Sequence, residues 1–313
     1  CAARGVGFLG WNTRFRGAEA YFLLDHAVAE IGVGVRWLRE QAGIETIVLL
    51  GNSGGGSLMA AYQSQAVDPN LAPEYGRKFI HDAAQEVPGA DLYISMMAHL
   101  GRPEVLTNWM DPSVQKESDP FSVNEQFNAY AHERQIPFPQ SFIDAYRREQ
   151  RDRNNRITHW VKREMDRIRD VGHYDRLFLT PRLWADLRMI DNSIDPSNRP
   201  TPSCYLGDPR RANYGIYGVG TVSSLTTWLS MWSLSDSQCT ASPHLARIRV
   251  PALALDADAD TGVFPSDTVK ITSALGSSDL TTRTLQGDHY LSDREGAREE
   301  AADLIVEWVK KRV

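Results

Sequence analysis

A serine between glycines is the first group in this sequence whose setting could support catalysis. The segment Gly51–Gly55 reads GNSGG and matches the pattern G-x-S-x-G, in which a serine stands on a sharp turn from a strand into a helix. Such a turn leaves little room for side chains two positions before and after the serine, which explains the glycines. A serine hydroxyl becomes an effective nucleophile when a neighbouring base takes its proton. The pattern predicts Ser53 as a nucleophile if the chain supplies that base.

A glycine-rich turn of this kind can also bind phosphate. Phosphate-binding turns carry a lysine in the GK[ST] position or the spacing GxGxxG, and neither occurs around Ser53. The placement between an apolar run and a helical segment favours the nucleophile instead. The backbone N–H of Gly54 is then expected to be one donor of the oxyanion hole.

An acid and a histidine follow late in the chain, in the order that a Ser-Asp-His triad on this kind of sheet requires. Asp260 comes just past the apolar run 251–256, and His289 comes just past residues 281–285. Asp260 would accept a hydrogen bond from one imidazole nitrogen, and the other nitrogen would face Ser53. Asp256 and Asp258 lie in the same acidic loop and are weaker alternatives for the acid.

Four residues are expected to contribute to substrate binding. They are Asn52, His99, Trp228 and Trp232. His99 follows the predicted strand 91–97 and is the one rival to His289, although a backbone partner would satisfy it equally well. The tryptophans are either an apolar pocket wall or ordinary core. The other six histidines are expected on the surface: His26, His81, His132, His159, His173 and His244.

The elements that must position these residues alternate between strands and helices. Near-continuous apolar runs predict buried strands at 6–11, 44–50, 91–97, 251–256 and 281–285. Helical periodicity is found at 20–41, after the serine to about residue 66, and at 296–311. This alternation predicts an α/β fold with a doubly wound, mostly parallel sheet.

Between residues 102 and 245 the pattern changes, which indicates an inserted, mainly helical cap. A polar helix is expected at 141–170 with the apolar stripe Ile157, Val161, Met165 and Ile168, followed by loop at 191–220 and a buried helix at 221–234. The predicted organisation is therefore a hydrolase core in two parts, 1–101 and 246–313, separated by the cap at 102–245.

Composition excludes several other classes of function. The chain has 313 residues, which suits one sizeable domain with an insertion, and a net charge of −6. A nucleic-acid partner is not expected, because phosphate-binding surfaces need a basic excess. No apolar run approaches the ~18 residues of a membrane span. Three cysteines without CxxC spacing argue against a zinc site or disulfide framework and favour the cytoplasm.

The chain resembles the α/β-hydrolase superfamily in residues 4–66, 90–103 and 246–311. Besides the serine turn, the similar motifs are the segment Arg4–Gly17 with its Arg-Gly turn, the strand and acid at Val250–Asp260, and the histidine loop Gly287–His289. The superfamily has three strands before the one matched at Val6, and the loop after its third strand carries the second oxyanion donor. We therefore expect roughly 50–90 residues to precede Cys1, from the usual size of α/β units.

These residues predict a serine hydrolase, most readily a carboxylic ester hydrolase acting on a small-molecule acyl substrate through an acyl-enzyme. Thioesters, peptide bonds and C–C bonds remain open for the same triad. A non-catalytic ligand-binding protein on the same scaffold is the alternative from another class. The mechanism needs no cofactor or metal, and the sequence leaves a homo-oligomer open.

Overall fold

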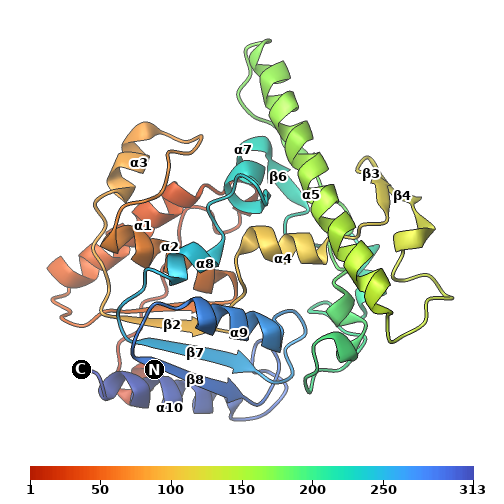
Figure 1. Ribbon diagram of the computed structural model, residues 1–313. Helices are drawn as coiled ribbons and strands as arrows, with labels where there is room; N and C mark the ends of the chain where they lie inside the picture. The colour runs from red at the N-terminus through yellow and green to blue at the C-terminus, as the bar shows by residue number, and fades with distance from the viewer.

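The computed structural model describes residues 1–313, and a sheet of four parallel strands lies at its centre (Figure 1). The strands are β1 (Val48–Asn52), β2 (Leu92–Met96), β7 (Ala252–Ala257) and β8 (Leu280–Leu285), in the order β1-β2-β7-β8. Because all four are parallel, their carboxyl ends meet at one edge of the sheet, where open α/β sheets place their sites.

Helices cover both faces of the sheet, which confirms the doubly wound α/β fold. Side chains from α1 (Leu24–Glu40), α2 (Gly54–Val67), α8 (Ala241–Leu245) and α9 (Pro265–Ala274) share one buried cluster with Tyr93 of β2. The opposite face packs against α10 (Ala297–Lys310) through Leu92 and Ile94. This alternation along β2 follows from the two-residue period of a strand and explains its continuous apolar sequence.

The segment between β2 and β7 carries most of the remaining elements. Its helix α5 (Gln140–Arg169) extends away from the sheet (Figure 1), and the predicted stripe Ile157, Val161, Met165 and Ile168 is buried. Around α5 lie α4 (Arg102–Trp109), α6 (Pro209–Asn213), α7 (Leu225–Thr227), the antiparallel pair β3 (Val114–Lys116) and β4 (Asp119–Val123), and the antiparallel pair β5 (Leu177–Leu179) and β6 (Val222–Ser224). The predicted helix 221–234 is therefore wrong at its start, where β6 pairs with β5, and it continues through α7 into a π-helical turn at Trp228–Trp232.

Smaller helices complete the chain. An α-helix that the sequence did not indicate, α3, spans Lys78–Ala84. Single 3-10 turns lie at Ala2–Arg4, Glu19–Tyr21, Glu125–Phe127, Leu187–Met189 and Asn192–Ile194. No helix combines the length and the apolar character that crossing a bilayer requires.

The first predicted strand, at 6–11, is wrong. The chain there is coil, and Phe8 and Trp11 are 65% and 45% exposed. Gly7 and Gly10 supply no side chains to pack, and no backbone hydrogen bond joins this segment to β1. The second predicted strand is displaced: β1 begins at Val48, while Ile44 is exposed beyond Gly43, whose φ is 64°. Since β1 is an edge strand, only alternate residues are buried.

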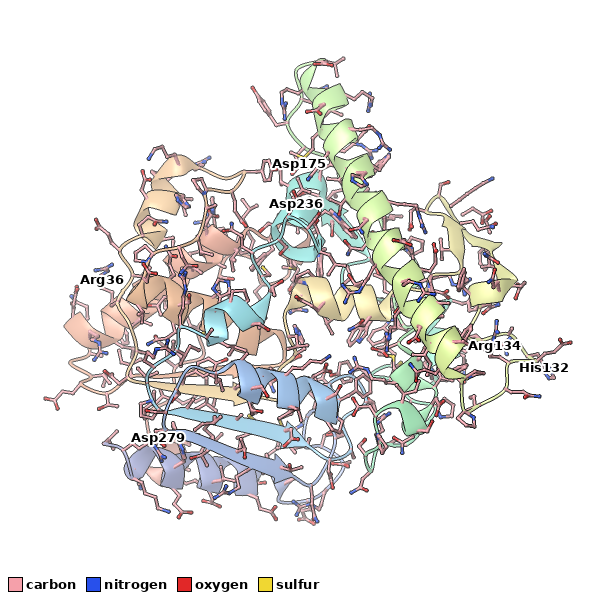
Figure 2. The ribbon with its side chains drawn as sticks, in the orientation of Figure 1. Arg36, His132, Arg134, Asp175, Asp236 and Asp279 are labelled. Carbon is pink, nitrogen blue, oxygen red and sulfur yellow. The ribbon has the colours of Figure 1, made fainter.

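Polar and charged side chains cover the outer surface, and His132 and Asp279 are two exposed examples in Figure 2. Of the six histidines expected there, His132, His159 and His173 are exposed. The prediction is wrong for His26, His81 and His244, which are buried. His26 and His81 both contact the buried Asp25, at 2.7 and 3.3 Å. A hydrogen bond to a carboxylate offsets the cost of burying an imidazole ring. The sequence did not show that Asp25 would contact both of these histidines.

Candidate active site

Ser53 is the single residue between β1 and α2, and it forms the sharp turn that its motif predicts. Its φ and ψ are 55° and −122°, a conformation that residues with a Cβ rarely adopt. The backbone N–H of Ser53 donates to the carbonyl of Met96 at the end of β2 (2.9 Å), which fixes the turn against the neighbouring strand. Gly54 begins α2, so its N–H has no acceptor within the helix.

The glycines around Ser53 are needed for different reasons. A Cβ on Gly51 would lie 2.3 Å from the carbonyl oxygen of Gly55, and one on Gly56 would lie 2.3 Å from the Cβ of Ala98. These contacts explain the first glycine of the motif by crowding, as expected. The same expectation is wrong for Gly55, because a Cβ there would have no atom within 4 Å.

His289 and Asp260 form a buried pair at the ends of the last two strands. His289 Nδ1 lies 2.6 Å from Asp260 Oδ2, and each side chain is 2% exposed. Asp260 Oδ1 also accepts the backbone N–H groups of Gly262 and Val263, both at 2.9 Å. These bonds hold the carboxylate in one orientation, so that it fixes the imidazole with Nδ1 toward the acid.

Tyr205 joins this pair from the segment between β2 and β7. Its hydroxyl donates to Asp260 Oδ1 at 3.2 Å and lies 2.9 Å from His289 Nδ1. Its ring packs on the imidazole with 4.5 Å between centroids. Burial, together with the nearby Asp260, raises the pKa of Tyr205 well above its ordinary value, so the hydroxyl stays protonated and able to donate. No motif or periodicity pointed to this residue, because Tyr205 belongs to an irregular loop.

The two alternative acids have other partners. Asp258 accepts the backbone N–H of Gly287 at 2.9 Å and the side-chain amide of Asn198 at 2.8 Å. Burial raises the pKa of Asp256, and Thr284 is its hydrogen-bond partner. Neither makes a hydrogen bond to His289, so Asp258 holds the histidine loop in place and Asp260 orients the ring.

The serine hydroxyl itself has no partner in this structure. No hydrogen bond joins Ser53 Oγ to His289. Hydrogen bonds between a nucleophile and its base are often long in unliganded enzymes and tighten when substrate binds. The structure therefore brings Asp260 and His289 together and places Ser53 at the same carboxyl ends of the strands. It does not form the hydrogen bond between Ser53 and His289.

Two of the predicted binding residues are engaged with backbone. His99 is buried, and its Nδ1 accepts the N–H of Gly101 at 3.1 Å. Burial, with the nearby Arg102 and His289, lowers the pKa of His99 well below its ordinary value, so this ring is neutral. Asn52 is exposed, and its amide donates to the carbonyl of Met96 at 3.2 Å. Both side chains brace the ends of β1 and β2.

The two predicted tryptophans differ in their surroundings. Trp228 is fully buried, donates to Thr158 Oγ1 at 2.9 Å and packs on Phe178, so it belongs to the core. Trp232 is also buried, and the guanidinium of Arg102 lies 5.7 Å from its ring centroid. Arg102 in turn lies against Gly54. Trp232 therefore supports a residue at the nucleophile turn.

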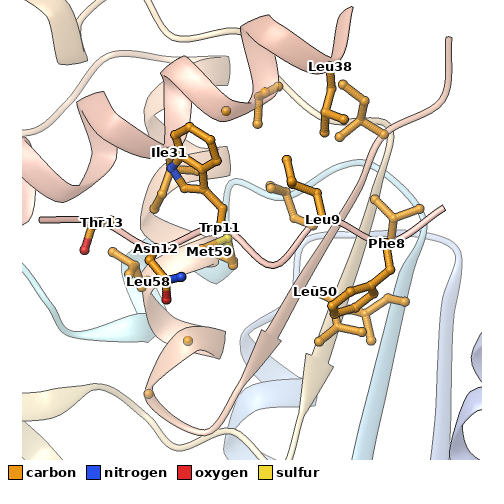
Figure 3. Close-up of a pocket in the computed structure, with 18 of the residues that line it drawn as sticks. Phe8, Leu9, Trp11, Asn12, Thr13, Ile31, Leu38, Leu50, Leu58 and Met59 are labelled. Carbon is orange, nitrogen blue, oxygen red and sulfur yellow. The ribbon is translucent and has the colours of Figure 1, made fainter. Parts of the chain in front are cut away.

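A large cavity lies beside the Ser53 turn, along the free edge of β1 (Figure 3). It has a volume of about 1060 Å³ and a mostly apolar lining that includes Phe8, Leu9, Trp11, Leu50, Leu58 and Met59. The cavity reaches Gly54, Gly55 and Arg102, but Ser53 and His289 are not among its lining residues. It thus reaches the start of α2, directly after Ser53.

The serine turn follows β1, the acid follows β7 and the histidine follows β8, which is the order along the strands that the sequence motifs predicted. The chain has an α/β-hydrolase fold. No family model matches this sequence, and no curated protein matches it.

Several solved structures are similar to the chain at low identity. A monoacylglycerol lipase from Paleococcus ferrophilus is 16% identical, with 90% of this chain and 74% of that chain covered and a TM-score of 0.40. DcsB in complex with a substrate analogue is 15% identical, with 92% and 72% covered and a TM-score of 0.47. An alpha/beta fold family hydrolase from Bacillus anthracis is 11% identical, with 91% and 74% covered and a TM-score of 0.35.

Proposed function

We propose that the protein is a serine hydrolase that cleaves carboxylic esters through an acyl-enzyme on Ser53. The observation that carries the proposal is the buried pair of Asp260 and His289, 2.6 Å apart, at the same edge of the sheet as the strained serine turn. Burying an imidazole and a carboxylate together is costly unless they bond to each other. A pair of this kind beside a nucleophile turn suits the transfer of a proton from the serine.

In the proposed reaction, Ser53 Oγ attacks the ester carbonyl while its proton passes to His289 Nε2. His289 then gives that proton to the leaving alcohol, and Ser53 is left acylated. A water molecule, whose proton passes to the same nitrogen, attacks the acyl group and releases the carboxylic acid product. Asp260 remains ionised and stabilises the imidazolium. No step requires a metal or cofactor.

The substrate class in this proposal is a small acyl ester. The support is chemical: esters are the least demanding substrates for an acyl-enzyme mechanism, because the alcohol leaves readily. Thioesters, peptide bonds and C–C bonds use the same residues and are distinguished by a substrate panel. We also propose a cytoplasmic location, since Cys1, Cys204 and Cys239 are free thiols and reducing compartments keep thiols in that state.

The test is hydrolysis of p-nitrophenyl butyrate by the wild type and by Ser53→Ala. Removing a triad serine is expected to lower kcat by on the order of 10³-fold or more. Ser278→Ala is the matched control, because Ser278 is exposed and its hydroxyl makes no hydrogen bond. Equal activity in the wild type and in Ser53→Ala would show that Ser53 is not the nucleophile.

A non-catalytic binding protein is the second candidate, and the absence of a Ser53–His289 hydrogen bond favours it. A fluorophosphonate probe separates the two functions. An activated Ser53 is labelled in the wild type and not in Ser53→Ala, whereas a binding protein is labelled in neither. The probe does not depend on knowing the acyl group.

A further inference from the structure

Arg102, the first residue of α4, lies directly against the nucleophile turn. A Cβ placed on Gly54 would be 2.2 Å from Arg102 Nη2 and 2.5 Å from its Cζ. The guanidinium therefore fills the space that a side chain at position 54 would occupy. Its other face is supported by Trp232, whose ring centroid lies 5.7 Å from Arg102 Cζ.

The charge of Arg102 is not neutralised by the protein. No hydrogen bond or ion pair engages its guanidinium, and burial lowers the pKa of Arg102. Four other arginines are buried, and each has acceptors: Arg153 binds Glu117, Arg182 binds Asp111, Arg188 binds Asp186, and Arg199 binds backbone carbonyls. Arg102 is half-buried beside the cavity and has no such acceptor. A positive charge kept in this way is suited to an anion that comes from outside the chain.

We propose that Arg102 and the backbone N–H of Gly54 together bind the oxyanion that forms when Ser53 attacks its substrate. This inference rests on the proposed hydrolase function and makes Arg102 a catalytic residue. It adds a donor from a side chain on α4, next to the positive amino end of α2.

The electron flow places the negative charge beside Arg102. As Ser53 Oγ bonds to the carbonyl carbon, the π electrons of the C=O bond move to its oxygen, and the serine proton goes to His289. When the intermediate collapses, these electrons re-form the C=O bond, and the alkoxide leaves with the proton from His289. The oxygen is anionic only between these events. A fixed cation there stabilises the transition state more than the bound ester.

A carboxylate on the substrate is the other anion that could reach this guanidinium. The contact with Gly54 favours the oxyanion, because Gly54 directly follows Ser53 and its N–H has no acceptor within α2. The two anions predict different kinetics. Binding a substrate carboxylate lowers KM, whereas binding the oxyanion raises kcat.

The first test is Arg102→Met with p-nitrophenyl butyrate, an ester without a carboxylate. We expect kcat to fall by about 10²- to 10³-fold, as when one oxyanion donor is removed, with KM changed by less than about threefold. A trifluoromethyl ketone, which forms a tetrahedral adduct with serine, should lose affinity by a similar factor. Arg148→Met is the control, because Arg148 is exposed and has no ion pair, and it should match the wild type.

Gly54→Ala gives a second test that keeps the arginine. The added Cβ must displace the guanidinium, a flexible group, so the protein should fold with a melting temperature near that of the wild type. We expect Gly54→Ala to lower kcat at least 10-fold in the wild type. In the Arg102→Met background the same change should lower kcat much less, because the effects of two residues that act together do not add. The single variant Gly54→Ala remains informative if Arg102→Met folds poorly, because it keeps the arginine.

Two results would overturn the inference while leaving the hydrolase intact. In the first, fluorophosphonate labels Ser53 in the wild type, but Arg102→Met leaves kcat unchanged. The other is a rise in KM confined to esters that carry a carboxylate, which would assign Arg102 to substrate binding. Failure of labelling in the wild type would instead reject the proposed function and, with it, the inference.

Discussion

The two halves of the candidate site differ in how completely their polar groups are bonded. In the acid–base half, Asp260, His289 and Tyr205 bond to one another, and backbone N–H groups satisfy the remaining carboxylate oxygen. In the nucleophile half, Ser53 has a strained backbone and a hydroxyl without a partner, and Arg102 has no counter-ion. The polar groups of one half are satisfied by one another, whereas those of the other half have no partner in the protein and, in the proposed reaction, would bind the substrate.

The largest effect should come from breaking the acid–base half. Asp260→Asn keeps the shape of the side chain but removes the charge that fixes the imidazole, so kcat should fall by about 10³- to 10⁴-fold. Steady-state ester hydrolysis measures this loss. Asp258→Asn weakens a bond to Gly287 and leaves the partner of His289 in place. It should cost less than about 10-fold, and equal losses in the two variants would contradict the assignment of the acid.

The strained backbone of the nucleophile half can be tested through stability. Gly51→Ala would place a Cβ 2.3 Å from the carbonyl oxygen of Gly55, a backbone atom that cannot rotate away. We expect the free energy of unfolding to fall by about 2–4 kcal/mol, measured by urea titration, with loss of fluorophosphonate labelling. Gly10→Ala, where a Cβ meets no atom within 4 Å, should change stability by less than about 0.5 kcal/mol. A well-tolerated Gly51→Ala would show that the turn is not crowded.

Substitutions of Tyr205 measure how much this residue contributes to the activity of the Asp260–His289 pair. Tyr205→Phe removes the hydroxyl that donates to Asp260 but keeps the ring that packs on His289. We expect kcat to fall by about 3- to 10-fold with little change in KM, the size of a lost hydrogen bond. Tyr205→Ala should cost more, because it also removes the packing. A Tyr205→Phe variant with wild-type kcat would show that the hydroxyl contributes nothing, and equal losses in the two variants would show that the ring contributes nothing.

The smallest effect concerns the wall of the cavity beside Ser53, which includes Leu24. Glu74 accepts the N–H of Leu24 (2.8 Å) and the hydroxyl of Ser230 (2.7 Å). Burial raises the pKa of Glu74 from about 4.5 to about 7. The folded protein therefore binds a proton that the unfolded chain releases between these values, so this contribution to stability is complete below pH 4.5 and is lost as pH rises through 7.

Glu74→Gln should remove that pH dependence. Between pH 5 and pH 8, the wild type is expected to lose on the order of 1–3 kcal/mol more stability than the variant. Urea titrations of both proteins at the two pH values measure the difference. Parallel stability profiles would mean that Glu74 is ionised throughout and that the wall is held by other contacts.

The sequence predicted best what depends on position along regular elements. Asp260 and His289 were identified because each follows a strand, and the carboxyl ends of parallel strands meet at one edge. Tyr205 and Arg102 were missed because their proximity to the site depends on how an irregular loop and the start of α4 fold back. The strand expected at 6–11 fails for a related reason, since an apolar run forms a strand only where another strand pairs with it.

The position of β1 at the edge of the sheet has a consequence for hydrogen exchange. About half of its amides point away from β2 and have no acceptor, whereas those of β2 are bonded to strands on both sides. Exchange should therefore be fast at alternate positions of β1 and slow throughout β2. Because β1 leads directly into Ser53, slower exchange on binding of an inhibitor would report, one amide at a time, how firmly the nucleophile is held.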